Sequence, residues 1–180
     1  LDVDDCLFRD NAGASEGGAI YIAERAKMDV KDSIFGGNSA LGDGGAVRSL
    51  GDADFADCTF SGNIAADNGG AVEAYRNTNN PETRIILRLN FEHCDFTGNR
   101  ASAGFNGWGG AVHFQDFVAK FTDCSFIGNT AKNGGAMLLS GGEVTINGGF
   151  IDRNRAVGGS GISAVSTSII SLFLPIETDL

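Results

Sequence analysis

Aspartate is the residue whose spacing in this sequence comes closest to suggesting catalysis, because it recurs about once in every 25 residues. One set of positions comprises Asp2, Asp29, Asp54 and Asn90, and a second comprises Asp5, Asp32, Asp57, His93 and Asp123. If each interval is one turn of a stack of parallel strands, neighbours within a set lie ~4.8 Å apart at the backbone. That is close to the ~5–5.5 Å between the two carboxyl groups of a retaining glycosidase. Stacking alone produces such pairs, so the spacing is weak support for an enzyme.

The second aspartate set falls where the alternation of apolar and polar residues slips by one position, which indicates a bend. Aspartate at a bend caps free backbone amides, so we interpret this set as structural. The alternative is weak calcium binding by the stacked carboxylates, with Asp5, Asp32 and Asp57 as candidate ligands.

Glu73 and His113 are a second possible catalytic pair, an acid and a base in neighbouring turns. They belong to a set of mixed residues that we expect to point outward into solvent: Tyr21, Arg48, Glu73, His113, Leu138 and Ser163. Mixed polar residues are the ordinary composition of a solvated sheet face. We therefore predict that the chain is not an enzyme. The cysteines recur once per interval, unlike the ligands of a zinc site, and no cofactor is indicated.

The elements that hold these residues follow from an internal repeat, in which Phe-x-x-Asn is followed by Gly-Gly-Ala and an apolar residue. The Phe positions are Phe8, Phe35, Phe60, Phe96 and Phe126, with Ile151 in a worn sixth copy. The Asn positions are Asn11, Asn38, Asn63, Asn99, Asn129 and Asn154. Repetition at this period means an array in which each unit buries its apolar face against its neighbours.

Short alternating segments and the absence of helical periodicity predict an all-β fold. Specifically, we predict a right-handed, single-stranded parallel β-helix of about six coils with three short strands each. The Phe residues form an aromatic ladder inside the coils, and each Asn bonds to the Asn above and below it. Residues 1–180 are one β-helix domain, which we expect to be a segment of a longer array, with insertions at about 75–88 and 102–108.

Composition limits the partners and the redox chemistry. Twenty-three acidic against thirteen basic residues give a net charge of −10, which argues against nucleic acid and anionic membrane surfaces as partners. The apolar run 169–176 is broken by Ser171 and Pro175 and is too short to span a bilayer. Four cysteines share one position of the repeat, where either buried free thiols or at most one disulfide is possible.

The paired motifs, Phe-x-x-Asn and Gly-Gly-Ala-Ile/Val/Met, resemble the repeat of the polymorphic outer-membrane protein family. The resemblance runs from Cys6 to about Val165 and includes five intact copies; the sixth has Gly-Ser-Gly in place of Gly-Gly-Ala. It implies a non-catalytic, extracellular or cell-surface β-helix module that serves adhesion or builds a surface structure or filament. The alternative is a carbohydrate-active enzyme, a polysaccharide lyase or glycosidase, on the same scaffold.

Candidate contact residues lie in the two insertions, because solenoids place functional variation in loops that leave the repeat. Trp108, the one Trp of the chain, stands where other copies have Glu, Asp or Asn. We predict that Tyr75, Arg76, Phe105 and Trp108 border one side of the module and contact a protein, a glycan or a neighbouring chain at a cell surface. The competing interpretation is that Phe105 and Trp108 fold back over their own insertion.

Overall fold

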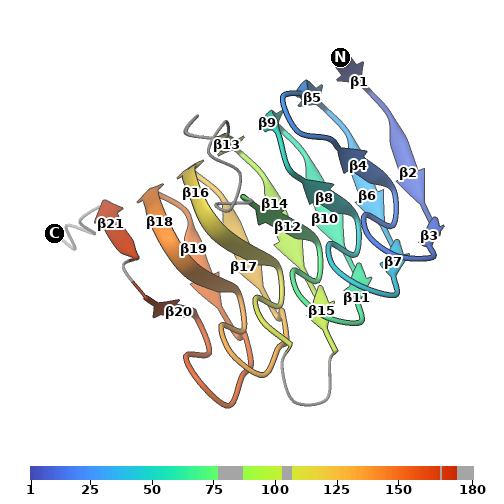
Figure 1. Cartoon of the computed structure of the whole chain (residues 1–180). Helices are drawn as coiled ribbons and strands as arrows, with labels where there is room; N and C mark the ends of the chain where they lie inside the picture. The colour runs from blue at the N-terminus through green and yellow to red at the C-terminus, as the bar shows by residue number, and fades with distance from the viewer. Residues whose placement is uncertain (77–86, 103–106, 167, 174–180) are drawn as a thin grey trace, which may run out of the picture.

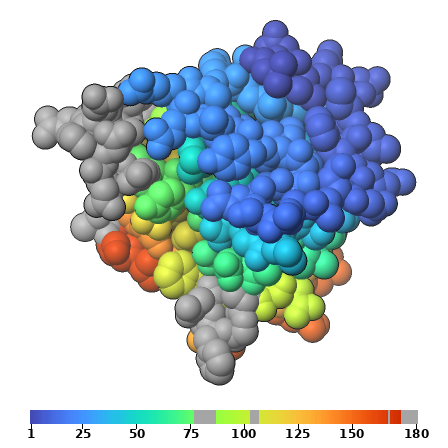
Figure 2. All heavy atoms as spheres, turned by 45° about the vertical axis from the view of Figure 1, so that its right-hand side comes forward, coloured from blue at the N-terminus to red at the C-terminus, as the bar shows by residue number. Residues whose placement is uncertain are grey.

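The chain forms a parallel β-solenoid in a computed structural model that describes residues 1–76, 87–102, 107–166 and 168–173 (Figure 1). All strand pairs within these residues are parallel. The strands form three sheets of eleven, six and four strands, and each strand of the six-stranded sheet belongs to a different coil. The predicted all-β solenoid with three parallel sheets and about six coils is therefore confirmed. Successive coils follow one another as bands of colour on the molecular surface (Figure 2).

Each coil passes through the sheets in a fixed order. It begins with a strand of the eleven-stranded sheet. The equivalent strands of successive coils, which we call the first row, are β1 (Asp2–Asp4), β5 (Lys27–Lys31), β9 (Asp52–Ala56) and β13 (Arg88–Glu92). The six-stranded sheet follows, with β2 (Leu7–Arg9), β6 (Ile34–Gly36), β10 (Thr59–Ser61), β14 (Asp95–Thr97), β17 (Ser125–Ile127) and β19 (Phe150–Asp152). The four-stranded sheet comes next, with β3 (Ala12–Gly13), β7 (Ser39–Ala40), β11 (Ile64–Ala65) and β15 (Arg100–Ala101).

The coil ends with a second strand of the eleven-stranded sheet. These equivalent strands, which we call the last row, are β4 (Ile20–Ile22), β8 (Val47–Ser49) and β12 (Val72–Tyr75). Two long strands join the last row of one coil to the first row of the next: β16 (Val112–Thr122) and β18 (Met137–Asn147). The C-terminal strands β20 (Ile162–Val165) and β21 (Ile169–Phe173) both pair with β18. The last row is the segment that carries the residues after each Gly-Gly-Ala.

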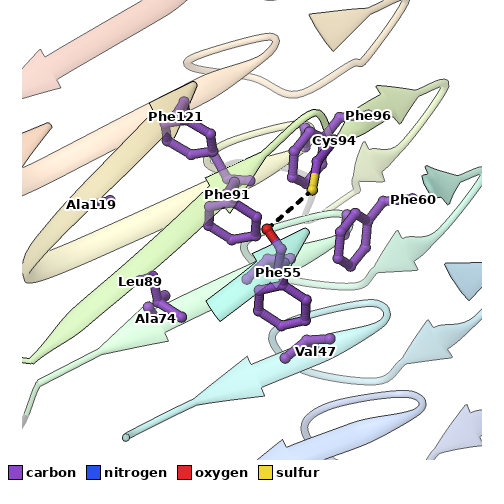
Figure 3. Close-up of a cluster of buried hydrophobic side chains, with 14 of the residues drawn as sticks. Val47, Phe55, Phe60, Ala74, Leu89, Phe91, Cys94, Phe96, Ala119 and Phe121 are labelled. Atoms are coloured by element: carbon purple, nitrogen blue, oxygen red, sulfur yellow. Dashed lines mark hydrogen bonds between the residues drawn. The ribbon is translucent and has the colours of Figure 1, made fainter. Parts of the chain in front are cut away.

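Stacked phenylalanines fill the core, as the repeat predicts. Consecutive rings from Phe8 to Phe126 lie 4.7–4.8 Å apart and within a few degrees of parallel. A second stack, Phe55, Phe91 and Phe121, meets the first edge to face (Figure 3). Aromatic pairs favour both geometries, and each ring also buries a large apolar area.

The asparagines form the predicted hydrogen-bonded ladder at the corner that follows the six-stranded sheet. In each coil the backbone N and the side-chain Nδ2 of the Asn donate to Oδ1 of the Asn in the next coil, at 2.9–3.0 Å. Nδ2 also donates to the carbonyl oxygen of the preceding coil's Phe, as Asn99 does to Phe60 at 2.9 Å. The four central asparagines are fully buried, and the ladder satisfies their polar groups.

The predicted bend is made by residues with a left-handed backbone. Asp5, Asp32, Asp57, His93 and Asp123 all have φ between 46° and 53°. Asp, Asn and His tolerate this region better than most residues, which explains why the sequence repeats aspartate there. The bend also allows Val3 and Cys6, which lie on either side of Asp5, to point inward although they are an odd number of positions apart.

The second glycine of each Gly-Gly pair is required by stacking. A Cβ on Gly45 would collide with the carbonyl oxygen of Gly70, and the same contact recurs between the other consecutive coils. The sixth copy has Ser160 at this position, and within the described residues no later strand pairs with the last-row strand of that coil.

Candidate functional site

Of the predicted contact residues, the structure describes Tyr75, Arg76 and Trp108. Tyr75 and Arg76 are half-buried at the end of β12, and Arg76 donates its backbone N–H to Gln115 at 3.1 Å. Trp108 is half-buried immediately before the Gly pair of its coil. Phe105 lies outside the described residues, as does most of the 75–88 insertion. Between Tyr75 and Trp108 runs a polar column formed by the last row of the sheet.

The middle of this column is buried, so the prediction that it forms a solvated face is wrong for Arg48, Glu73, His113 and Leu138, although Tyr21 at its start is exposed. Its central members are Arg48, Glu73 and His113, whose exposed fractions are 6%, 3% and 1%. They point outward from the coil, but residues that stand immediately before the Gly pairs pack against Arg48 and His113. Trp108 contacts the ring of His113 edge to face, with centroids 5.6 Å apart. Arg48 lies under Glu16 and Asp43, the residues that precede the Gly pairs of their coils.

Arg48 is the positive centre of this covered column. It forms an ion pair with Glu73 in the next coil, and its nitrogens lie 3.3 Å from Asp43 and 3.5 Å from Glu16. Its guanidinium carbon lies 5.3 Å from the ring centroid of Tyr75, a cation–π contact. A buried guanidinium needs this number of partners, because an unpaired buried charge is strongly destabilising.

His113 is a neutral member of the column. Burial lowers its pKa to about 4; Asp43 opposes the shift, while Arg48 adds to it. Its Nδ1 lies 3.1 Å from the Glu73 carboxylate. In the neutral ring Nδ1 therefore carries the proton and donates a hydrogen bond to Glu73. Nε2 is then an acceptor, and it is buried with no hydrogen-bond partner. Trp108 packs against this imidazole.

The covered column is arranged for stability rather than for proton transfer to a substrate. Both oxygens of Glu73 are engaged, one by Arg48 and the other by His113. General acid or base catalysis needs a group within hydrogen-bond reach of the reacting atoms, and neither side chain is accessible in this structure. The sequence offered one signal of this arrangement: in three successive coils the column reads Arg, Glu, His, an order that suits pairing between coils.

The candidate calcium ligands Asp5, Asp32 and Asp57 are exposed carboxylates at the bend. Their backbone geometry accounts for their recurrence, and His93 stands between two of the column's carboxylates, 3.5 Å from Asp57 and 3.9 Å from Asp123. Across the residues that the structure describes, no three His, Cys, Asp or Glu side chains are grouped closely enough to hold a metal ion. Calcium binding stays a prediction.

An open groove of about 760 Å³ lies over the first row of the eleven-stranded sheet. Its polar lining consists of Asp2, Asp4, Lys27, Asp29, Lys31, Asp54, Asn90, Glu92, Lys120 and Thr122. The strand register aligns Asp2, Asp29, Asp54, Asn90 and Lys120, so the first aspartate set does form one column. Lys27 bridges Asp29 and Asp54 at 3.3 and 3.4 Å, and Asn90 donates to Asp54 at 2.6 Å. Sequence reasoning identified the column but not the concave surface around it.

All four cysteines are free thiols. Cys58, Cys94 and Cys124 are buried in consecutive coils, and each donates to backbone carbonyl oxygens, as Cys94 does to Phe55 at 3.5 Å (Figure 3). Hydrogen bonding with Cys124 and Cys58, together with burial, raises the pKa of the Cys94 thiol. These residues act as small apolar members of the core, one of the two alternatives that the sequence left open.

The described part of the chain contains no helix that is long and apolar enough to cross a membrane. Searches of curated proteins and of solved structures gave no match to this sequence. A family model, the Chlamydia polymorphic membrane protein repeat, matches residues 5–23 and 57–75. Each match begins at an aspartate of the bend and ends in or just after a last-row strand, so it contains the Phe, the Asn and the Gly-Gly-Ala of one coil. Two coils of this parallel β-solenoid therefore match the Chlamydia polymorphic membrane protein repeat.

Proposed function

We propose that this solenoid is a non-catalytic module of an extracellular or cell-surface protein and that it serves adhesion or the building of a surface structure. The observation that carries the proposal is the continuity of its columns. The Phe ladder runs without interruption from Phe8 to Phe126 and the Asn ladder from Asn11 to Asn154, and Glu73 and His113, the acid–base pair considered from the sequence, are buried. An active site needs accessible groups in distinct environments, which continuous columns do not supply.

The repeat match supports a surface protein of the polymorphic membrane protein type, and the net charge of −10 disfavours nucleic acid as a partner. The proposed module binds a protein or a glycan at a cell surface, or a neighbouring chain. We retain Tyr75, Arg76, Phe105 and Trp108 as the proposed contact surface. Tyr75 and Trp108 both also contact the covered column, Tyr75 at Arg48 and Trp108 at His113, so the thermal stability of each variant is measured beside its attachment.

The contact surface is tested by Tyr75→Ala and Arg76→Ala in an adhesion assay with the purified module immobilised on beads. One aromatic anchor can carry ~2 kcal/mol or more of binding energy, so Tyr75→Ala is expected to reduce attachment to cells substantially. Thr97→Ala, an exposed change on the six-stranded sheet, is the matched control. Equal attachment of all three variants would remove this surface from the proposal.

A carbohydrate-active enzyme is the second candidate, and the groove with its aligned carboxylates is the observation that favours it. The test is incubation of the module with neutral and acidic polysaccharides, followed by detection of new reducing ends and unsaturated products. We expect no turnover. Turnover that Asp54→Asn abolishes would establish the enzyme and overturn the non-catalytic proposal.

A further inference from the structure

We propose that the groove over the first row binds an uncharged, linear oligosaccharide laid along the solenoid axis. The inference rests on the proposed function, because it names the glycan partner of a non-catalytic surface module. It is carried by the shape of the groove, the balance of its charges and the hydrogen-bonding capacity of its side chains.

The shape of the groove fits a chain rather than a compact molecule. Its lining comes from β1, β5, β9, β13 and the second half of β16, one segment from each of five consecutive coils. With neighbouring strands ~4.8 Å apart, the floor is about 19 Å long from the first strand to the fifth. Equivalent side chains repeat along this floor at the strand spacing. A polymer with a short, regular repeat meets such a series in successive subsites.

The charge of the groove disfavours polyanions and gives little advantage to polycations. Five carboxylates line it, against the three lysines Lys27, Lys31 and Lys120. Lys27 already binds two of these carboxylates, and hydrogen bonding to Asp29 and Asp54 raises its pKa, so it stays charged and keeps them paired. Lys31 and Lys120 would repel a cationic chain. The large negative charge of the whole molecule repels an anionic one.

The hydroxyl groups of a sugar can form hydrogen bonds with every kind of polar side chain in the groove, because a hydroxyl both donates and accepts. Carboxylates such as Asp4 only accept and ammonium groups such as Lys31 only donate, and the strand register places these two residues side by side. Adjacent hydroxyls of a sugar can satisfy both. The side chains are partly preorganised, since Lys27 and Asn90 hold Asp54 in place from two sides.

The test is titration calorimetry of the intact module with five linear hexasaccharides. Three are uncharged: cellohexaose, laminarihexaose and maltohexaose. The fourth is hexagalacturonate, an anion, and the fifth is chitosan hexamer, a cation. We expect binding of at least one uncharged probe, with an affinity that changes little between low and high salt, because an uncharged ligand forms no ion pairs for salt to screen. Exclusive binding of a charged probe, or no binding of any uncharged probe, would overturn the proposal.

Variants locate the site. Asp29→Ala and Asn90→Ala each remove hydrogen-bonding groups from the groove, and we expect each to weaken binding of the uncharged probe about tenfold. Asp54→Asn keeps the side-chain volume and serves as a conservative variant, and Thr97→Ala is the control from the same coil as Asn90. Equal weakening by Thr97→Ala would place the binding elsewhere and contradict the proposal.

The same samples separate this inference from the proposed function. A bound hexasaccharide that remains intact supports both. A hexasaccharide that binds and is cleaved supports the groove as the site but overturns the non-catalytic function. A module that neither binds nor cleaves any uncharged probe overturns the inference while the proposed function stands.

Discussion

The inward ladders and the covered column of Arg48, Glu73 and His113 are both buried stacks, yet they are built on opposite rules. The ladders repeat one residue in every coil, so each side chain finds an identical neighbour above and below it. The covered column changes residue at each coil, and each side chain fits one particular neighbour. The ladders therefore specify the stacking of coils in general, whereas the covered column can distinguish one register of the stack from another.

The difference matters because a one-coil slip would affect the two stacks unequally. Phe on Phe and Asn on Asn would be regained after such a slip. Arg48 would lose Glu73, and His113 would lose its acceptor. Buried charges that depend on one partner are costly when they are mispaired, which is how polar groups can fix register in otherwise uniform repeats.

The largest expected effect comes from removing a member of the aromatic ladder. Phe60 is fully buried and touches Phe35, Phe55, Phe91 and Phe96. Phe60→Ala should lower the free energy of unfolding by ~3–5 kcal/mol, because it leaves a cavity among rings that are held by the coils on either side. Urea melts monitored by circular dichroism measure this. Thr97→Ala, an exposed control, should stay within about 0.5 kcal/mol of the wild type.

Breaking the covered column should cost about 3 kcal/mol in the single variant Glu73→Leu, because the buried Arg48 then loses its closest partner and keeps only the longer contacts with Asp43 and Glu16. The double variant Arg48→Met, Glu73→Leu should recover much of the loss, since it removes both charges and keeps the volume. A double-mutant cycle in denaturant gives the coupling energy. Additive losses would mean that the two residues are not energetically paired and that the covered column does not help to fix the register of the coils.

Asn99→Ala should have a smaller effect, about 1–3 kcal/mol. The change removes the hydrogen bonds of one ladder side chain and leaves two backbone groups of the preceding coil, Asn63 N–H and Phe60 C=O, without these partners. Hydrogen exchange should then accelerate at Asn63, whose backbone N–H donates to Asn99. Unchanged exchange at that amide would show that water or another group replaces the lost acceptor.

The ladders could be predicted from the sequence because a repeat carries its own register. Once Phe8, Phe35 and Phe60 are aligned, every other residue of the coil is placed relative to its neighbours, and the structure confirms the columns. The bend could be predicted because apolar residues an odd number of positions apart cannot share a face without one.

The burial of Glu73 and His113 could not be predicted in the same way. Strand alternation says that they point outward, which is correct, but it does not say what lies outside. The cover depends on the path of the loop before Gly69 and Gly109, and each of these glycines turns the chain sharply with a positive φ. The concave shape of the groove is likewise a property of strand orientation over five coils, which no local pattern in the sequence records.

His113 gives the last and smallest prediction, a change in the pH dependence of stability. Its folded-state pKa of about 4 lies below the ordinary value of 6.5, so the unfolded chain binds more protons between these two values. The contribution of His113 to the free energy of unfolding is therefore fully present above about pH 6.5. It falls as the pH drops toward 4, because unfolding releases the imidazole from a site where it cannot easily be charged.

His113→Gln keeps a hydrogen-bond donor for Glu73 but does not titrate. Carboxylates contribute to acid denaturation in both proteins, so the informative quantity is the difference between them. Denaturation midpoints measured across this pH range should decline less steeply for the variant than for the wild type. Identical slopes would mean that His113 is charged as readily in the folded protein as in the unfolded chain, and that the covered column is open to solvent.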